Sequence, residues 1–484
     1  MKYEQKNGWE IISEDEKNQV YDFCESYKEY LNNGKTERLC VDYTISLAKE
    51  AGFAEFNETK KLVAGDKIYI NNRGKSIILA VVGKKDITEG INLVAAHIDS
   101  PRLDLKQNPL YEDTDLALLK THYYGGIKKY QWTTIPLAMY GVVVKADGTK
   151  VNIAIGDDEN DPVFCVTDLL PHLAQKQMSQ KLGEAITGEN LNVLIGSLPT
   201  DTEKDKIKET VLVILNENYG IEEEDFLSAE IEVVPSGKAR DIGLDRSLIG
   251  AYGHDDRVCS YGALKGILEI DNPDKTAVCL LADKEEIGSM GNTGMQAEYF
   301  EYAISAMINS QSGNFNELML RKCFANSKCL SADVGAAMDP TYKEVSEPRN
   351  APKANYGVMI CKYTGARGKS GSSDASAEFM GEVRKICKDN DIVWQIGELG
   401  KVDEGGGGTV AQYVANRNID TIDCGVPVLS MHAPFEIVAK MDVYMSYKLY
   451  KSFYLIWGET NEKGQYWSTD TKHISCYKKM VIFR

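Results

Sequence analysis

The chain has 484 residues, of which 43% are hydrophobic, so it can bury more than one core; we expect two domains or one domain with a large insertion. Lys and Arg number 55 against 72 for Asp and Glu, and the formal net charge of -17 argues against nucleic acid or an anionic membrane surface as a partner. The N-terminal sequence MKYEQKNGWE lacks the apolar stretch of a signal peptide, and no later apolar run approaches the roughly 20 residues of a membrane span. Eleven cysteines without a C-x-x-C pair indicate thiols in a reducing compartment, which predicts a cytoplasmic protein.

Two helices are expected at the N-terminus. Ser13 and Glu16 form a possible capping box for the first helix. Its apolar face repeats at helical spacing through Val20, Phe23, Cys24, Tyr27 and Leu31. The Asn33-Gly34 pair ends this helix, and a second one is predicted over about residues 36–51.

Apolar runs then alternate with amphipathic segments. The runs that read as strands are INLVAAHI, TAVCLLA, KCLSAD, NYGVMICKY, DIVWQIGE and TIDCGVPVLSMH. Helices are expected over residues 257–270 and 373–390, and in the second of these a core stripe is predicted at Ala375, Phe379, Val383 and Ile386. Buried strands separated by amphipathic helices predict an α/β fold, with a sheet covered by helices on both faces.

The stretch from about residue 101 to residue 242 has a different pattern. It contains the strand-like segments IPLAMYGVVVKA and KVNIAIG, joined by Asp147-Gly148, and a polar region rich in Lys and Glu over residues 175–208. This pattern predicts a β-rich insertion between the first strand of the sheet and the rest.

Five short segments present an oxygen or imidazole ligand where an apolar run ends. They are AAHIDSP (His97, Asp99), GHDDR (Asp255, Asp256), ADKEEIG (Glu285, Glu286), SADVG (Asp333) and SMH (His432). Two imidazoles and several carboxylates, with no cysteine among them, fit a pair of zinc-like ions that share a carboxylate. The segments together therefore predict a metallohydrolase.

Each of these residues also has an ordinary structural interpretation. A single histidine at a strand end is usually just hydrogen-bonded, and an acidic pair is usually solvated. Asp99 lies two residues after His97, so its carboxylate could orient that imidazole or its metal-bound partner. Both Glu285 and Glu286 can reach one cavity only where the strand breaks into a turn, and the following Ile-Gly pair favours such a break.

The aspartate segments leave the division of roles open. One residue of the Asp255-Asp256 pair could bridge two metals while its neighbour caps the helix that begins near residue 257. For Asp333, a metal-ligand role and a turn or capping role fit the sequence equally well.

Taken in order, AAHIDSP, HDDR, DKEEIGS, SADVG and SMH resemble the aspartyl aminopeptidase and vacuolar-type aminopeptidase I family of dinuclear zinc metallo-aminopeptidases, over roughly residues 10–457. The resemblance implies a phosphorylase-like α/β catalytic domain over residues 1–100 and 243–484. A β-rich dimerisation domain over residues 101–242 would interrupt it. It also implies two divalent metal ions, zinc before manganese or cobalt, and a tetrahedral homododecamer.

The resemblance further implies roles for single residues. The metal ligands would be His97, Asp255, Glu286, Asp333 and His432, with Asp255 as the bridge. Glu285 would be the general base that generates a metal-bound hydroxide. Asp99 is predicted as a second catalytic residue from its position beside His97. His172 matches a histidine that reaches a neighbouring subunit's active site, although a direct metal ligand is an alternative. Lys362 matches a substrate-binding lysine.

The predicted function is therefore removal of the N-terminal residue from peptides with free N-termini. The ligand set alone would equally suit a carboxypeptidase or a deacylase, and a catalytically silent oligomeric shell protein is a further alternative. Ala336 stands where animal-type members have a substrate-contacting histidine, and a glycine-rich segment follows Lys362, so a preference for acidic N-terminal residues stays open. No function is predicted for the tail after about Gly458.

Overall fold

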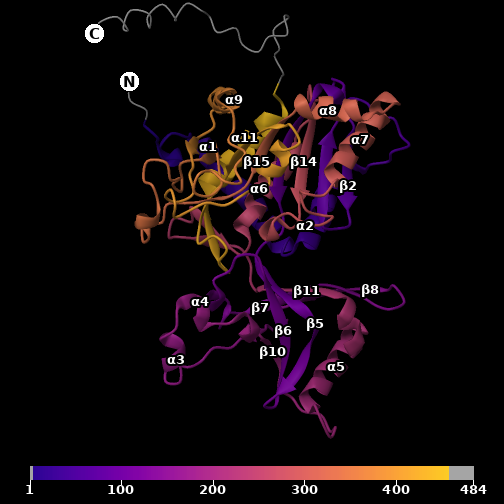
Figure 1. The fold of residues 1–484 in the computed structure, drawn as a ribbon, viewed down its shortest axis with the longest axis vertical. Helices are drawn as coiled ribbons and strands as arrows, with labels where there is room; N and C mark the ends of the chain where they lie inside the picture. Colours follow the sequence, from indigo (N-terminus) through magenta and orange to yellow (C-terminus); the bar gives the residue numbers. More distant parts are fainter. Residues whose placement is uncertain (1–3, 457–484) are drawn as a thin grey trace, which may run out of the picture.

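The computed structural model describes residues 4–456, which form two lobes (Figure 1). The second lobe comprises residues 102–235, and the first lobe comprises the other described residues. The tail after about Gly458 and the first three residues of the N-terminal sequence lie outside the described residues. Within residues 4–456, no helix combines the length and apolar character that crossing a membrane requires.

A nine-stranded sheet is the centre of the first lobe. Its strands, in spatial order, are β1 (Ala54–Glu55), β2 (Lys67–Asn72), β3 (Ser76–Val81), β14 (Thr276–Ala282), β4 (Ile91–His97), β15 (Lys328–Ala332), β19 (Asp420–Gly425), β17 (Val358–Cys361) and β18 (Trp394–Ile396). The four central strands β14, β4, β15 and β19 run parallel, so their carboxyl ends meet at one edge of the sheet.

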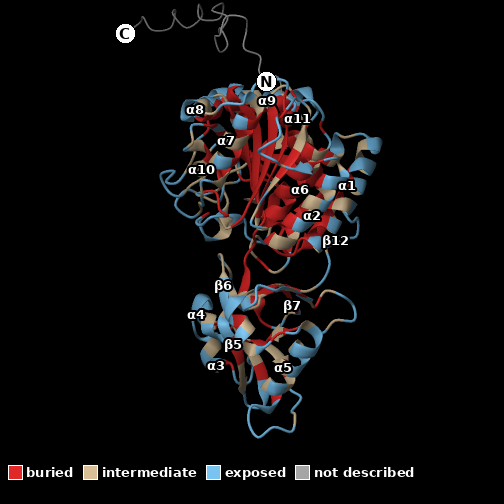
Figure 2. Ribbon diagram, turned by 90° about the vertical axis from the view of Figure 1, so that its right-hand side faces the viewer, coloured by how far each residue is buried: buried red, intermediate tan, exposed pale blue. Residues whose placement is uncertain are grey.

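Helices cover both faces of this sheet. One face packs against α1 (Glu14–Asn33), α2 (Glu37–Glu50), α6 (His254–Leu268), α9 (Ala377–Asp389) and α11 (Lys440–Tyr454), and the other against α7 (Tyr299–Ser312), α8 (Glu317–Ala325) and α10 (Ala411–Ala415). Successive side chains of β4 point to opposite faces of the sheet, which explains the two layers of helices. Val94 and Ala96 lie in the core on the first face, and Leu93 and Ala95 lie in the core on the other. Figure 2 shows these buried strands and helices in red. The α/β prediction is confirmed.

The helix boundaries follow their capping residues. Ser13 accepts a hydrogen bond from the main-chain N–H of Glu16 at 3.2 Å, but the carboxylate of Glu16 bonds to Lys448 instead of returning to the cap, so only half of the predicted capping box forms. Helix α9 begins four residues later than predicted because Ser376 caps it. The predicted core stripe of Ala375, Phe379, Val383 and Ile386 is buried.

A seven-stranded antiparallel sheet forms the second lobe. Its strands, in spatial order, are β8 (Lys150–Ile155), β7 (Leu137–Val144), β11 (Ala229–Pro235), β5 (Arg102–Asp113), β6 (Leu116–Tyr124), β10 (Val193–Gly196) and β9 (Cys165–Val166). The helices of this lobe are α3 (Gln175–Met178), α4 (Leu182–Ala185) and α5 (Lys206–Tyr219). The lobe has its own hydrophobic core around Trp132.

A smaller third sheet belongs to the first lobe. Its strands are β12 (Arg240–Ile242), β13 (Leu248–Ala251), β21 (Glu436–Ala439), β20 (Pro427–Leu429) and β16 (Gly335–Ala336). The segment TIDCGVPVLSMH, predicted as one strand, is therefore divided between β19 of the main sheet and β20 of this small sheet.

A buried charge cluster joins the two lobes. The guanidinium of Arg102, at the start of β5, lies 3.6 Å from Glu37 of α2, 3.2 Å from Glu232 of β11 and 2.8 Å from Asp104. Arg102, Glu37 and Glu232 are 7%, 1% and 6% exposed, so the pairs of Arg102 with these two glutamates are shielded from solvent. One guanidinium thus binds carboxylates from both lobes.

Candidate metal centre

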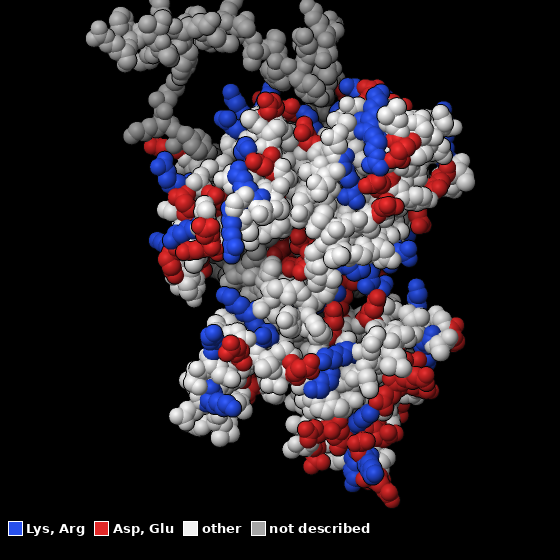
Figure 3. Space-filling model, in the orientation of Figure 1, with Lys and Arg blue, Asp and Glu red and all other residues white. Residues whose placement is uncertain are grey.

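The predicted ligands converge at the carboxyl edge of the main sheet. His97 is the last residue of β4, Asp333 follows β15, and Glu285 and Glu286 open a 3-10 turn, η6 (Glu285–Ile287), just beyond β14. Asp255 lies in the first turn of α6, and His432 lies in the loop between β20 and β21. Figure 3 shows acidic atoms at the bottom of a hollow in the first lobe.

Asp255 lies between the two histidines. One carboxylate oxygen, Oδ1, is 3.2 Å from Nε2 of His97, and the other, Oδ2, is 3.1 Å from Nε2 of His432. On the first side Asp333 lies 3.8 Å from His97, and on the second side Glu286 lies 3.5 Å from His432. Two ligand groups therefore share one carboxylate, which is the arrangement that a pair of ions needs.

The hydrogen bonds behind the imidazoles fix their orientation. Nδ1 of His97 is 3.1 Å from the carbonyl oxygen of Asp99 and 3.3 Å from its carboxylate, and Nδ1 of His432 is 2.7 Å from the carbonyl oxygen of Gly126. Carbonyl and carboxylate oxygens only accept hydrogen bonds, so each Nδ1 donates. Nε2 of each ring is then the nitrogen that faces Asp255 and that remains to bind a metal ion.

Asp99 contacts more than the imidazole that the sequence predicted. Its two carboxylate oxygens accept the main-chain N–H groups of Glu285 and Glu286, each at 3.1 Å, and the Tyr124 hydroxyl donates to it at 2.8 Å. Asp99 is completely buried. It therefore fixes the turn that presents both glutamates as well as the ring of His97.

Asp256 has a different environment from the one expected of a helix cap. Gly253 is the N-cap of α6 and no side chain caps this helix. Asp256 instead accepts the main-chain N–H of His97 at 3.4 Å, and its other oxygen is buried without a partner. Ligand atoms of His97, Asp256 and Asp333 lie within 4.8 Å of one another, so Asp256 is an additional candidate ligand.

Glu436 is a residue of the centre that sequence reasoning missed. Its carboxylate accepts the main-chain N–H of His432 at 2.6 Å and that of Asp255 at 3.0 Å, and the residue is 1% exposed. It thereby connects two ligand segments that are far apart in the chain. The acidic residue at the end of SMHAPFE was visible in the sequence, but its bond to Asp255 was not.

The charge of the centre is unbalanced. Within residues 4–456, no Lys or Arg forms an ion pair with Asp255, Glu285, Glu286 or Asp333. Burial, reinforced by neighbouring carboxylates, raises the pKa of Glu285 to about 8 and also raises the pKa values of Glu286 and Asp333.

Asp255 is the exception. Burial alone would raise its pKa, but hydrogen bonds from His432 and His97 hold it below its usual value. One oxygen of Glu286 is also buried without a partner. Buried carboxylates, an unpartnered oxygen and two imidazoles whose Nε2 atoms face inward fit divalent cations with nitrogen and oxygen ligands.

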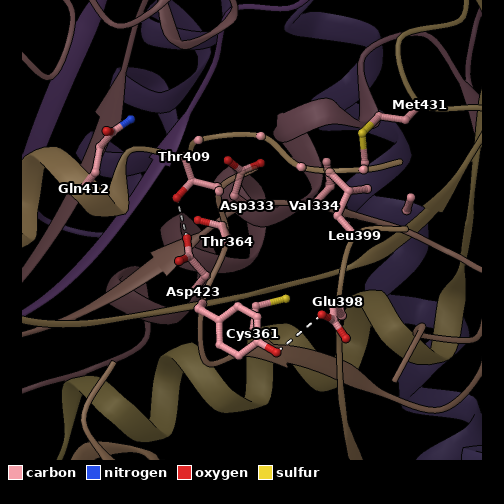
Figure 4. A pocket seen from close by; sticks show the side chains of 18 of the residues that line it. Asp333, Val334, Cys361, Thr364, Glu398, Leu399, Thr409, Gln412, Asp423 and Met431 are labelled. Carbon is pink, nitrogen blue, oxygen red and sulfur yellow. Dashed lines mark hydrogen bonds between the residues drawn. The ribbon is translucent and has the colours of Figure 1, made fainter. Parts of the chain in front are cut away.

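A cavity of about 580 Å³ lies beside this centre, large enough for the end of a peptide. Figure 4 shows part of its lining, including the candidate ligand Asp333 and Met431, which precedes His432 in the chain. Two buried or half-buried acids of this lining are hydrogen-bonded, Asp423 to Thr409 and Glu398 to Tyr363. Its cationic side chains are Arg367, Lys369 and Lys401.

His172 and Lys362 lie outside this cavity. His172 is exposed, three residues before α3 in the second lobe, and it does not line the pocket of its own chain. The Lys362 amine bonds to Asp374 at 2.8 Å, whereas Ala336 does line the cavity. The roles of His172 and Lys362 stay predictions.

Comparisons with known proteins agree with this geometry. A family model described as aminopeptidase I zinc metalloprotease (M18) matches residues 30–454. A probable M18 family aminopeptidase 1 from Clostridium acetobutylicum is 50% identical over 456 residues, covering 93% of this chain and 98% of the relative. A solved M18 aminopeptidase from Thermotoga maritima has a TM-score of 0.90 and 47% identity, covering 94% of this chain and 99% of that one. The solved S. cerevisiae mApe1 dodecamer, 19% identical with a TM-score of 0.74, covers 90% of this chain and 97% of that one and shares the fold.

An α/β sheet with a buried His/Asp/Glu centre beside a cavity is typical of a metal-dependent hydrolase. The chain belongs to the M18 family, aminopeptidase I, and it is an aminopeptidase.

Replacing Glu436 by Gln should disturb the centre through the backbone. The amide keeps one acceptor but presents a donor to the second N–H, so we expect a loss of about 1–3 kcal/mol in the free energy of unfolding. We also expect a roughly 10-fold or greater loss of metal affinity. Thermal unfolding and titration with zinc measure both quantities.

Asp442→Asn is the matched control. Asp442 is fully buried and accepts the main-chain N–H groups of Asn355 and Gly357 at 2.8 and 2.7 Å, but it contacts no candidate ligand. It should lose similar stability with unchanged metal affinity. Equal zinc affinities in the two variants would show that Glu436 only supports the fold.

Proposed function

We propose that this aminopeptidase hydrolyses the N-terminal peptide bond at a centre of two divalent ions. The ligands are His97, Asp255, Glu286, Asp333 and His432. The observation that carries the proposal is Asp255, whose two oxygens each face a different imidazole. Zinc suits this mixture of nitrogen and oxygen ligands, and manganese or cobalt are the alternatives.

Glu285 is the general base of the proposed reaction. When bound, the ions would polarise the peptide carbonyl and acidify the attacking water. Glu285 takes a proton from that water and passes it to the leaving amine. Two observations support the role: Oε2 of Glu285 lies 3.9 Å from Nε2 of His97, and burial raises the pKa of this carboxylate to about 8. Asp99 serves the reaction by holding the turn that carries Glu285.

The substrate is proposed to be a peptide with a free N-terminus. The family match identifies an aminopeptidase rather than the carboxypeptidase or deacylase that the ligand set alone also suits. The sequence also argues against a silent shell protein. Such a protein needs neither metal ligands nor a general base, and this chain retains every predicted ligand and the predicted base.

Glu285→Gln and Glu286→Gln separate the proposed roles. The first variant should retain zinc and lose about 100-fold or more in kcat, because an amide cannot accept the proton. The second should lose zinc, because a neutral amide replaces a ligand carboxylate. Metal analysis and assays on one peptide in free and N-acetylated forms measure these effects, and the wild type should cleave only the free form. An equal loss of zinc in both variants contradicts the assignment, and cleavage of the acetylated peptide contradicts the substrate class.

Lys362 is proposed to contact an acidic N-terminal residue of the substrate after leaving Asp374. Lys362→Ala should then lower kcat/KM for an aspartyl peptide about 10-fold and leave that for a leucyl peptide unchanged, since a charge-assisted hydrogen bond is lost. Lys369→Ala is the control, because Lys369 also pairs with Asp374 and lines the cavity. If only Lys369→Ala lowers kcat/KM for the aspartyl peptide relative to the leucyl peptide, the contact with the acidic residue belongs to Lys369 instead of Lys362.

The assembly is proposed to be a tetrahedral homododecamer. Its catalytic domain comprises residues 1–100 and 243–484, and residues 101–242 form a dimerisation domain. The dodecamer of the yeast relative supports this proposal. So does the surface around His172, where Leu169, Leu170 and Leu173 are 53%, 50% and 69% exposed. His172 would reach the active site of a neighbouring subunit and stabilise the oxyanion there, and a direct bond to the metal is the alternative.

Subunit mixing tests this arrangement. Particles of Glu285→Gln subunits and particles of His172→Phe subunits should each be nearly inactive. Hybrid particles should recover part of the activity, because some sites combine an intact base with a donated histidine. The measurement is activity after subunit exchange, with hybrid formation checked by native mass spectrometry. Confirmed hybrids without recovered activity would place the role of His172 within its own chain.

A cytoplasmic location is proposed as well. None of the ten cysteines in the described part of the chain forms a disulfide, and nine of them are buried. Unpaired buried thiols are typical of proteins in reducing compartments.

A further inference from the structure

Residues 124–126 of the second lobe, the Tyr-Gly-Gly segment in which β6 ends, lie against the metal centre of the same chain. The established family activity assigns nothing to this segment. Each of its three residues contacts a different part of the centre, through a hydroxyl, a close approach of the backbone and a carbonyl.

The carbonyl of Gly126 orients His432. It accepts a hydrogen bond from Nδ1 of that ring at 2.7 Å, which turns Nε2 toward Asp255 and Glu286. A Cβ atom at position 126 would lie 3.3 Å from the same Nδ1. The backbone of the second lobe is thus in direct contact with a ring of the first.

Gly125 packs against Glu286. Its φ of +73° favours glycine, and a Cβ atom there would lie 3.3 Å from both Cβ and Oε2 of Glu286 and 3.4 Å from Cβ of Pro101. A side chain at this position would therefore crowd a candidate ligand on one side and touch the connection between the lobes on the other.

Tyr124 links the centre to the charge cluster between the lobes. Its hydroxyl donates to Asp99 at 2.8 Å, and Asp99 holds the turn of Glu285 and Glu286. The face of the Tyr124 ring lies 3.9 Å from the guanidinium carbon of Arg102, which pairs with carboxylates of both lobes. The position of the hydroxyl therefore depends on how the lobes are joined.

We propose that residues 124–126 are a positioning segment through which the second lobe completes the metal centre of its own chain. The hydroxyl of Tyr124 fixes the glutamate turn through Asp99, the carbonyl of Gly126 fixes the ring of His432, and Gly125 permits the close approach. This inference rests on the proposed function, because it takes Glu286 and His432 as metal ligands. It differs from the role proposed for His172, which acts between subunits.

Tyr124→Phe and Gly125→Ala test the segment. Tyr124→Phe keeps the ring on Arg102 and removes only the hydroxyl, so it tests the inference even if Gly125→Ala folds poorly. Both variants should bind zinc roughly 10- to 100-fold more weakly in competition with a chelator, and kcat should fall while KM changes little. The visible absorption of the cobalt-loaded protein should change, because the ligand arrangement changes.

Two control variants lie in the same lobe. Gly148 has a φ of +87° in the turn between β7 and β8, and a Cβ atom there meets nothing within 4 Å, so Gly148→Ala reproduces the backbone strain without a contact to the centre. Tyr123→Phe removes a hydroxyl with no hydrogen-bond partner within residues 4–456. Both controls should match the wild type in zinc affinity, cobalt absorption and kcat.

The outcomes separate the inference from the proposed function. If the wild type takes up no zinc, the proposed metal centre fails and the inference fails with it. If the wild type takes up two ions and Tyr124→Phe and Gly125→Ala equal their controls in affinity and absorption, the positioning role is wrong and the centre stands. Sedimentation of each variant shows whether the assembly itself has changed.

Discussion

Four acidic side chains lie close together at the carboxyl edge of the sheet, and the site depends on how the chain holds these like charges in place. Asp255, Glu285, Glu286 and Asp333 are held together with no Lys or Arg paired to them within the described residues, although burial and mutual repulsion favour the neutral forms of Glu285, Glu286 and Asp333. The chain meets this constraint with backbone hydrogen bonds. The carboxylates of Asp99 and Glu436 each accept two main-chain N–H groups, and all four belong to residues that present a side chain to the centre.

The topology of the main sheet determines where these groups meet. Parallel strands place His97, Asp333 and the glutamate turn at one edge, which is the usual ligand-binding edge of an α/β sheet. The second lobe begins with Arg102 on the segment that leaves the same edge, shortly after His97. The part of the second lobe around Arg102 and residues 124–126, here called its root, therefore lies next to the centre because the lobe is inserted in the chain at this point.

Local patterns made much of this arrangement predictable, and long-range contacts were the part that sequence reasoning could not supply. Ligands at the ends of apolar runs follow from strand burial, so their convergence could be expected. The bond between Glu436 and Asp255 joins residues 181 positions apart, and that between His432 and Gly126 joins residues 306 apart. No periodicity or spacing rule reaches across such distances. The expected helix cap at Asp256 was wrong because the backbone there leaves the helical region before the helix is established.

Two parts of the second lobe differ in their surroundings: its root contacts the metal centre of the same chain, and the surface around His172 is exposed. Its root must keep a fixed position, because the charge cluster of Arg102, Glu37 and Glu232 and the hydroxyl of Tyr124 connect it to the centre of the same chain. The surface around His172 instead exposes apolar side chains away from the core of its own lobe. In the proposed assembly, a change at residues 102 or 124–126 would act on every subunit separately, whereas a change at the surface around His172 would act through contact between subunits. The sheet of this lobe connects these two regions, so the proposed assembly would be linked to the metal centre through one inserted lobe.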